Sequence, residues 1–304
     1  MYLQHFGLRE LPFSLTPNTQ FFLNMASYHK AYNMLMVSLA NSEGFIKIVG
    51  EVGTGKTMLC RKVLNTLEED KDNYVTAYIP NPVLSPKGLF LAFAEELNIP
   101  IDQEAGHHRL LKAITEKLVE QSAANKQVVL FIDEAHAMPE QTLEALRLLT
   151  NIETEQVKLF QVVLFAQPEL DLLLSQPSLR QLRQRITFSF EIEALDRDGV
   201  ERYVVHRLAT AGYNGPFLFS KRALDFLYRA SEGIPRVINI LSHKALMVAF
   251  GKGERTVQLD HIKNAAEDTE GIKLPGFNYM PAMIALVGLA VGAALVFYLG
   301  QFYL

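Results

Sequence analysis

Apolar residues in the first two thirds of the chain follow two alternating patterns. Short apolar runs bounded by turn residues are separated by longer stretches in which apolar residues recur every three or four positions. The short runs predict strands at 45–49, 74–79, 128–132, 159–165 and 186–192. The longer stretches predict helices at 28–40, 58–67, 84–97, 107–124 and 140–152. This alternation predicts an α/β fold, a parallel sheet flanked by helices on both faces.

The pattern changes after residue 194. Only helical periodicity remains, and it predicts helices at 197–211, 221–231, 235–250 and 259–267. We therefore expect an α/β core at 28–194 and a small all-α domain at 195–269. Residues 1–27 contain prolines and several aromatic residues, which predicts an irregular linker segment packed on the body of the protein. Residues 270–279 read as a second linker.

The end of the sequence is apolar on all sides. No charged residue occurs in 274–304, and 280–304 is almost wholly apolar. About 20 residues span the hydrocarbon core of a bilayer as a helix, so 280–304 predicts a transmembrane helix, with a buried helix of a globular core as the alternative. Lys263 and Lys273 precede the segment and no basic residue follows it. This predicts a single-pass protein of the inner (plasma) membrane with a cytoplasmic body.

The composition indicates which binding partners and which cellular compartment to expect for the protein. The 304 residues carry a net charge of −4 with a pI near 6.1, so there is no general attraction to polyphosphate backbones and no nucleic acid is expected as a partner. The only cysteine is Cys60, which excludes an internal disulfide and fits a reducing compartment.

A phosphate-binding motif follows the strand predicted at 45–49. The residues fit the spacing G-x-x-x-x-G-K-[ST], in which glycines let backbone N–H groups surround a phosphate at the positive end of the next helix. We expect Lys56 to reach the β and γ phosphates and the Thr57 hydroxyl to bind Mg²⁺. A glycine-rich turn with a chance lysine is the alternative, and the strand before and helix after favour the motif. The predicted nucleotide-binding residues are Gly50, Glu51, Val52, Gly53, Thr54, Gly55, Lys56, Thr57 and Met58.

Two carboxylates end the apolar strand predicted at 128–132. Ligands bind at the carboxyl edge of parallel sheets, so we expect Asp133 to hold Mg²⁺ through its water shell. Glu134 is the predicted base that accepts a proton from the attacking water. Adjacent acids are also typical of a solvated strand end, and it is the phosphate loop that favours catalysis. No guanine-reading N-K-x-D follows, so ATP is the expected nucleotide.

A sheet domain with nucleotide motifs followed by a small helical domain is the layout of an AAA+ ATPase, which has further polar residues at its site. Gln167 follows the strand predicted at 159–165 and is expected to hold the attacking water, with a helix cap as the alternative. Arg236 follows Pro235 at a helix start. We expect it to sense the γ phosphate, and a plain surface arginine remains the alternative.

Three arginines precede the last predicted strand. In ring-forming ATPases an arginine at this place points into the neighbouring copy's site and stabilises charge on the transferring phosphoryl group. Among Arg180, Arg183 and Arg185 we select Arg185, because it is nearest to the strand. The alternative is the solvated face of a helix.

These motifs together resemble the ExeA, or general secretion pathway A, type of AAA+ ATPase over residues 1–268. The similar segments are 6–17, 50–57, 132–136, 146–153, 167–170, 182–186 and 233–239. The resemblance implies a P-loop AAA+ ATPase with a small all-α lid that forms a homo-oligomeric ring, a hexamer being one arrangement. It also implies association with the inner membrane and with pilus or secretion assembly proteins. Within the family the sequence is most similar to members associated with the mannose-sensitive haemagglutinin pilus, a type IV pilus.

The resemblance also bears on single residues. The family pattern Gln-Arg-Ile at 184–186 supports Arg185. Ala166 stands where the family usually has glycine, and we expect a mild effect. Secretion-type members continue past the membrane span into a periplasmic peptidoglycan-binding domain, whereas this sequence stops at Leu304, so direct peptidoglycan contact is not implied.

Three functions remain in competition. The leading hypothesis is ATP hydrolysis by a membrane-tethered homo-oligomer that assists assembly of a type IV pilus or a type II secretion machine. The second is a DNA-associated AAA+ ATPase, such as a transposition or replication helper, which would be expected to carry a basic patch or an added DNA-binding domain. The third is a scaffold that binds ATP and hydrolyses it too slowly to do mechanical work.

Overall fold

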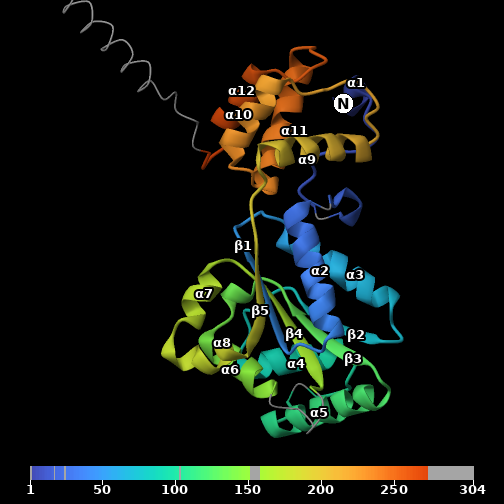
Figure 1. Cartoon of the computed structure of the whole chain (residues 1–304), viewed down its shortest axis with the longest axis vertical. Helices are drawn as coiled ribbons and strands as arrows, with labels where there is room; N and C mark the ends of the chain where they lie inside the picture. The colour runs from blue at the N-terminus through green and yellow to red at the C-terminus, as the bar shows by residue number, and fades with distance from the viewer. Residues whose placement is uncertain (1, 17, 24, 103, 151–157, 273–304) are drawn as a thin grey trace, which may run out of the picture.

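The computed structural model describes residues 2–272, apart from residues 17, 24, 103 and 151–157. Two lobes are visible in Figure 1, a sheet with its helices and a smaller all-helical lobe. The predicted transmembrane helix at 280–304 lies outside the described residues, as does most of the preceding linker. Among the described residues of 2–272, no helix is both long and apolar enough to cross a membrane.

A five-stranded parallel sheet forms the core of the larger lobe, in the order β2-β3-β4-β1-β5. The strands are β1 (Phe45–Gly50), β2 (Tyr74–Ile79), β3 (Gln127–Ile132), β4 (Phe160–Ala166) and β5 (Ile186–Ile192). All five had been predicted, each to within one residue at either end. Because every pairing is parallel, the carboxyl ends of β1, β3 and β4 meet at one edge of the sheet.

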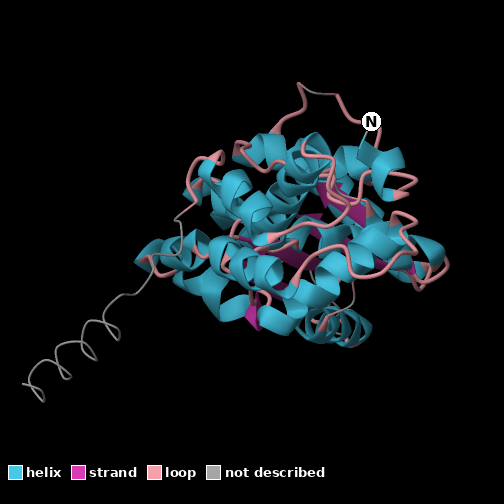
Figure 2. Cartoon of the chain, turned by 90° about the horizontal axis from the view of Figure 1, so that it is seen from above, coloured by secondary structure: helices cyan, strands magenta, loops and turns pink. Residues whose placement is uncertain are grey.

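Both faces of the sheet are buried under helices, as the α/β prediction required (Figure 2). Successive strand residues point to opposite faces. Ile46 and Ile48 of β1 pack with α2 and α3, whereas Leu130 and Ile132 of β3 pack with the helices on the other side. The first face is covered by α2 (Ala26–Ala40) and α3 (Lys56–Glu69). The second is covered by α4 (Pro86–Glu96), α5 (His107–Ala123), α6 (Glu140–Leu149), α7 (Glu169–Leu174) and α8 (Arg180–Arg185).

The elements of this lobe that the periodicity did not predict are short helices and helical turns. Besides α7 and α8 they are the 3₁₀ turns η2 (Ala135–Ala137) and η3 (Pro177–Leu179). The turn η2 directly follows the two carboxylates that end β3, and α7 directly follows the end of β4. Both therefore lie next to the edge of the sheet where the predicted site residues gather.

The smaller lobe, the lid, has the four predicted helices. They are α9 (Arg197–Thr210), α10 (Lys221–Ser231), α11 (Pro235–Gly251) and α12 (Leu259–Glu267). Nearby residues determine where two of these helices begin. Asp196 caps α9 by accepting a hydrogen bond from the Gly199 N–H at 2.6 Å, and Pro235 occupies the first turn of α11. Gly233, just before α11, has φ of 75°, and a Cβ there would lie 2.0 Å from the Leu195 carbonyl oxygen.

The N-terminal segment, residues 2–23, packs on the body of the protein as we expected, but it is less irregular than expected. It contains the helix α1 (Tyr2–Phe6) and the 3₁₀ turn η1 (Thr19–Phe21), and it packs on the lid. The Tyr2 hydroxyl lies 3.0 Å from Nδ1 of His243 on α11, and the Arg9 N–H donates to the Ala211 carbonyl at 2.8 Å. Aromatic contacts and backbone hydrogen bonds thus attach the segment to a lobe almost 200 residues further along the chain.

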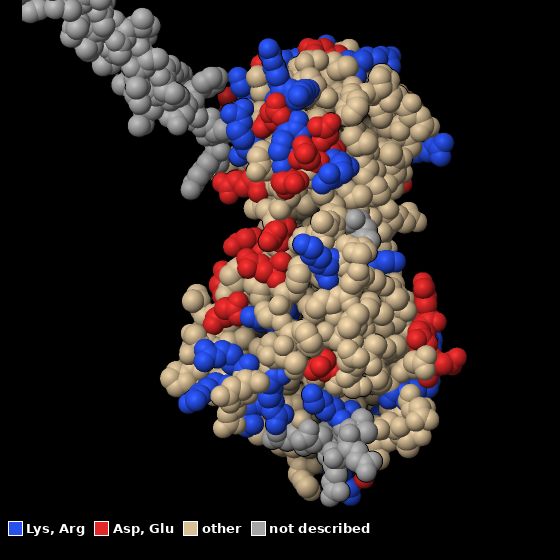
Figure 3. All heavy atoms as spheres, viewed as in Figure 1, with Lys and Arg blue, Asp and Glu red and all other residues tan. Residues whose placement is uncertain are grey.

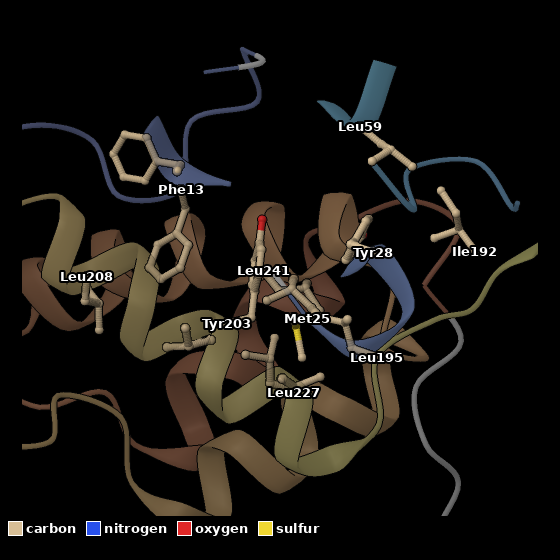
Figure 4. Packing of buried hydrophobic residues seen from close by; sticks show 14 of the residues in the cluster. Phe13, Met25, Tyr28, Leu59, Ile192, Leu195, Tyr203, Leu208, Leu227 and Leu241 are labelled. Atoms are coloured by element: carbon tan, nitrogen blue, oxygen red, sulfur yellow. The ribbon is translucent and has the colours of Figure 1, made fainter. Parts of the chain in front are cut away.

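A single apolar cluster runs from the lid through the N-terminal segment to the sheet (Figure 4). Figure 4 shows Phe13 and Met25 of the N-terminal region beside Tyr203 and Leu241 of the lid, with Leu59 of α3 nearby. All five belong to this cluster. The two lobes and the N-terminal segment therefore share one core, and the nucleotide motifs lie beside it.

Candidate nucleotide site

The phosphate loop connects the end of β1 to the start of α3. Gly53 and Gly55 have φ of 82° and 92°, a backbone region that favours glycine. A Cβ on Gly53 would lie 2.6 Å from Cβ of Arg236, so only glycine fits between the loop and the lid. Gly55 is the N-cap of α3 and provides no side-chain cap, which leaves the first N–H groups of α3 free to bind an anion.

Lys56 lies inside the loop with only 5% of its surface exposed. Its ammonium donates hydrogen bonds to the carbonyls of Gly50 at 2.7 Å and Glu51 at 2.9 Å. Burial lowers the pKa of Lys56, and the nearby carboxylates of Glu134 and Asp133 oppose this shift. The result is a compact, buried cation held where the loop would receive phosphate oxygens.

Asp133 and Thr57 provide neighbouring oxygen donors. The carboxylate of Asp133 is buried, which raises its pKa, while hydrogen bonds from the Thr57 side chain and the Glu134 N–H lower it. A hydroxyl and a carboxylate are ligands that Mg²⁺ prefers, and a buried carboxylate gains from a nearby cation, so this pair fits the ion. In the part of the chain that the structure describes, no group of three or more His, Cys, Asp or Glu residues could hold a metal. A metal ion held by Thr57 and Asp133 would take its other ligands from phosphate and water oxygens.

Glu134 and Gln167 meet at the ends of the adjacent strands β3 and β4. Glu134 has φ of 52°, an uncommon conformation for a non-glycine residue, and its side chain is 44% exposed. The Gln167 side-chain amide donates to Oε2 of Glu134 at 3.3 Å. His136 on η2 also reaches this point, with Nδ1 3.4 Å from the same oxygen. The predicted base and the predicted water-holding residue are thus brought together.

Arg236 reaches the phosphate loop from the lid. Its backbone N–H donates to the Gly53 carbonyl at 3.2 Å, and its side chain lines the same pocket as Lys56 and Thr57. Because Pro235 starts α11 immediately before it, the position of Arg236 depends on the position of the lid. The structure therefore places Arg236 beside the phosphate loop, and its sensing of the γ phosphate stays a prediction.

Arg185 lies away from this pocket. It ends α8 next to the first residue of β5, as the sequence indicated. Its guanidinium donates to Oγ1 of Thr150 at 2.6 Å and to the Arg147 carbonyl at 3.5 Å. Arg185 is absent from the described residues that line the nucleotide pocket of its own copy, so its predicted action on a neighbouring copy stays a prediction.

The pocket beside the phosphate loop has a volume of about 290 Å³ and is walled by three parts of the chain. The N-terminal segment provides Phe21 and Phe22, and the lid provides Tyr203 and Arg207. Among the predicted residues, the lining includes Val52, Gly53, Gly55, Lys56, Thr57, Met58, Glu134, Gln167 and Arg236. The motifs did not identify these residues. The run of aromatic residues before residue 28 was a signal for Phe21 and Phe22, whereas no sequence signal indicated Tyr203 and Arg207.

Tyr28, at the start of α2, contacts the phosphate loop and also lines the pocket. Its hydroxyl donates to the carbonyl of Thr54, and a Cβ on Gly55 would lie 2.9 Å from the same hydroxyl. Burial raises the pKa of Tyr28 far above its usual value, so the hydroxyl stays protonated and remains a donor. Sequence reasoning missed this residue, because nothing local distinguishes it from other apolar positions of its helix.

The sheet order and the site define the class of protein as an AAA-type P-loop nucleotide-binding protein. Residues 39–174 match the family model described as AAA domain. Cdc6p from Pyrobaculum aerophilum is similar with a TM-score of 0.68 and 17% identity, over 86% of this chain and 72% of that one. The RuvB Holliday junction branch migration motor of Thermotoga maritima is similar with a TM-score of 0.52 and 18% identity, over 79% and 68%. At these identities the likeness shows the fold alone.

Sequence similarity narrows the class further. The chain is 41% identical over 288 residues to general secretion pathway protein A of Aeromonas hydrophila. The alignment covers 95% of this chain and 52% of that protein, so the chain spans about half the length of this relative. The chain therefore belongs to the family of general secretion pathway protein A-type AAA proteins, and the resemblance found in its motifs is confirmed.

Proposed function

We propose that the protein hydrolyses ATP in a Mg²⁺-dependent reaction. The observation that carries the proposal is the convergence of Lys56, Thr57, Asp133, Glu134 and Gln167 at one edge of the sheet, around a loop whose glycines leave backbone N–H groups free. Anion-binding N–H groups, a buried cation, two hard oxygen ligands and a base are the parts that phosphoryl transfer to water requires. AAA-type nucleotide binding is common to the family, and hydrolysis is our inference from this arrangement.

Each residue has a defined task in the proposed reaction. The loop and Lys56 bind the β and γ phosphates. Thr57 and Asp133 would hold Mg²⁺, which when bound would neutralise charge on the phosphate oxygens. Glu134 accepts one proton from water as the water oxygen attacks the γ phosphorus. The bond from that phosphorus to the β–γ bridging oxygen breaks, and ADP leaves. Gln167, beside Glu134, orients the water.

We further propose that a second copy of the chain completes the site. Lys and Arg side chains gather over the region of α6 and α8 in Figure 3, where Arg180, Arg183 and Arg185 lie. Exposed acids flank the phosphate loop at Glu51 and at Glu191 on the neighbouring strand β5. Opposite charges on two separate surfaces favour a head-to-tail contact between copies, which forms a ring when the rotation from one copy to the next closes.

The last part of the proposal concerns the membrane-associated assembly in which the protein acts. The apolar segment 280–304 supports a tether to the inner membrane with the ATPase on the cytoplasmic side. The relative's name places that relative in a general secretion pathway, and the motifs resemble those of pilus-associated members. We therefore infer a role in assembling a type IV pilus or a secretion machine. The DNA-associated alternative gains no support, because the DNA-acting neighbours share only the fold.

The role of Glu134 has a direct test. Glu134→Gln keeps the size of the side chain and removes the base, so ATP binding is expected to persist while phosphate release falls at least about 100-fold. Glu140→Gln is the matched control, because Glu140 is an exposed acid at the start of α6 that is not among the described pocket-lining residues. Equal rates for the wild type and the Glu134→Gln variant would remove the assigned base.

A mixing experiment tests the action of Arg185 across an interface. Subunits with Arg185→Ala and subunits with Lys56→Ala are each expected to be inactive, and their mixture is expected to regain part of the activity. Regain occurs because some sites combine an intact Lys56 with a neighbour's intact Arg185. Replacing the second partner with the double variant Lys56→Ala, Arg185→Ala is the control, which is expected to restore nothing. A mixture without regained activity at any ratio would argue against the role in trans.

Crosslinking in intact membranes tests the assigned machine. We expect pilus or secretion assembly proteins among the partners that are joined to the full-length chain. The ATPase rate, measured with and without those partners, then separates a working motor from a slow scaffold. Recovery of DNA-processing proteins instead would favour the second hypothesis.

A further inference from the structure

His136 stands beside the proposed base without a task in the reaction above. It lies on η2, two residues after Glu134, and its side chain is only 18% exposed. Its Nδ1 atom is 3.4 Å from Oε2 of Glu134 and 3.4 Å from the backbone nitrogen of Gln167. The Gln167 side-chain amide donates to the same Oε2 at 3.3 Å. One carboxylate oxygen is therefore approached from two sides, by η2 and by the end of β4.

The other oxygen of Glu134, Oε1, makes no hydrogen bond with any residue that the structure describes, and Glu134 lines the nucleotide pocket. A carboxylate anchored through one oxygen keeps the other available to accept a proton. A side chain that is 44% exposed and lacks such anchors would sample several rotamers, and most of these point the acceptor away from the water. Anchoring Oε2 thus has a direct consequence for catalysis.

The ring nitrogen Nδ1 of His136 lies between two groups of the site. The Gln167 N–H donates to the lone pair of Nδ1, so Nδ1 carries no proton in this arrangement, and its approach to Oε2 of Glu134 is a contact and not a hydrogen bond. The ring therefore acts on Glu134 through Gln167, because the residue whose N–H it accepts is the one whose side-chain amide donates to Oε2.

We propose that His136 is a positioning residue for the base. Its Nδ1 accepts the Gln167 N–H and so fixes the residue whose side-chain amide holds Oε2 of Glu134, which directs Oε1 toward the attacking water. This inference rests on the proposed hydrolysis with Glu134 as base. His136 itself takes no proton from water and touches no phosphate in this assignment.

Two substitutions separate positioning from mere packing. The Asn side chain places a polar atom at the position of Nδ1, whereas the Gln side chain places one near Nε2. His136→Ala and His136→Gln are expected to lower kcat about two- to tenfold, the effect of losing one hydrogen bond between neutral groups, with the KM for ATP within about twofold of the wild type. His136→Asn is expected to restore most of kcat. ATP binding by each full-length variant reports that the fold is intact.

A double variant completes the experiment. If His136 acts through Glu134, adding His136→Ala to the Glu134→Gln variant lowers the residual rate no further. An additive loss, an equal kcat for the Asn and Gln variants, or a raised KM with unchanged kcat would overturn the positioning role. A wild type that releases no phosphate, or a Glu134→Gln variant as fast as the wild type, would instead overturn the proposed function and this inference with it.

Discussion

Arg207 is a buried cation that joins the lid to the N-terminal segment, and removing it should loosen both. Only 4% of its surface is exposed. The guanidinium donates to the carbonyls of Pro12 at 2.5 Å and Ser14 at 3.0 Å, and it lies 4.4 Å from the centre of the Phe21 ring. Burial lowers the pKa of Arg207, and the nearby Tyr203 side chain opposes this shift.

The magnitude follows from these contacts. Each hydrogen bond from a charged donor contributes about 1.5–3 kcal/mol, and a desolvated cation–π contact contributes about 2 kcal/mol. The desolvation of the guanidinium opposes these gains, and Arg207→Ala leaves two carbonyls without their donor. We expect a net loss of about 3 kcal/mol in the free energy of unfolding. For a domain of this size that loss lowers Tm by roughly 6–12 °C.

The assay compares two arginines of the same helix. Arg202, also on α9, has a side chain that is 65% exposed and lies 3.9 Å from Asp196. Arg202→Ala is therefore expected to change stability by no more than about 0.5 kcal/mol. Thermal unfolding of the two variants should differ, and limited proteolysis should cut residues 2–23 faster only in Arg207→Ala. A Tm for Arg207→Ala within about 2 °C of that for Arg202→Ala would refute the reasoning.

Three further perturbations follow from buried polar groups. Tyr28→Phe removes the donor to the Thr54 carbonyl, so the KM for ATP should rise about three- to tenfold in steady-state assays with little change in kcat. Gln161→Leu removes an amide that donates to the Leu39 carbonyl at the end of α2 and to the Glu43 carbonyl just beyond it, at 3.2 and 3.0 Å. Urea unfolding should show a loss of about 1–3 kcal/mol. Burial lowers the pKa of His206 and of His243 in the folded state. Between the folded and unfolded pKa values only the unfolded chain takes up these protons, so Tm should fall as the pH drops below about 6.5. An unchanged KM would contradict the expectation for Tyr28→Phe, and an unchanged urea midpoint would contradict that for Gln161→Leu. A Tm that stays constant between pH 7.5 and 5.5 would contradict the expectation for the two histidines.

The long elements could be predicted from the sequence because each contains its own signal. The run 74–79 is rich in β-branched and aromatic residues and ends in turn residues, and the strand has the same bounds. The helix 221–231 has a strong apolar face and a serine cap, and it too has the predicted bounds. By contrast, α7 and α8 have six residues each, fewer than two turns, so no periodicity could reveal them.

The residues of the candidate site also fall into those that the sequence could predict and those that it could not. The phosphate loop could be predicted because its residues are consecutive and its glycines have a local conformational reason. Arg207 could not be predicted, because the sequence does not distinguish a buried arginine from an exposed one. Its hydrogen-bond partners, Pro12 and Ser14, are also far away in the sequence. His136 was noted only as part of a resemblance, and its relation to Glu134 depends on how η2 turns after β3. The catalytic roles of all these residues stay predictions until the variants are measured.

The attachment of residues 2–23 to the lid has a consequence for how the chain is made. The contact between Tyr2 and His243 joins residues 241 positions apart, and that between Arg207 and Pro12 joins residues 195 apart. At about 5–20 residues per second, a ribosome needs roughly 10–50 s to synthesise that interval. During this time Tyr2, Phe6 and Phe13 have no lid to cover them, so the nascent chain exposes apolar surface of the kind that chaperones bind.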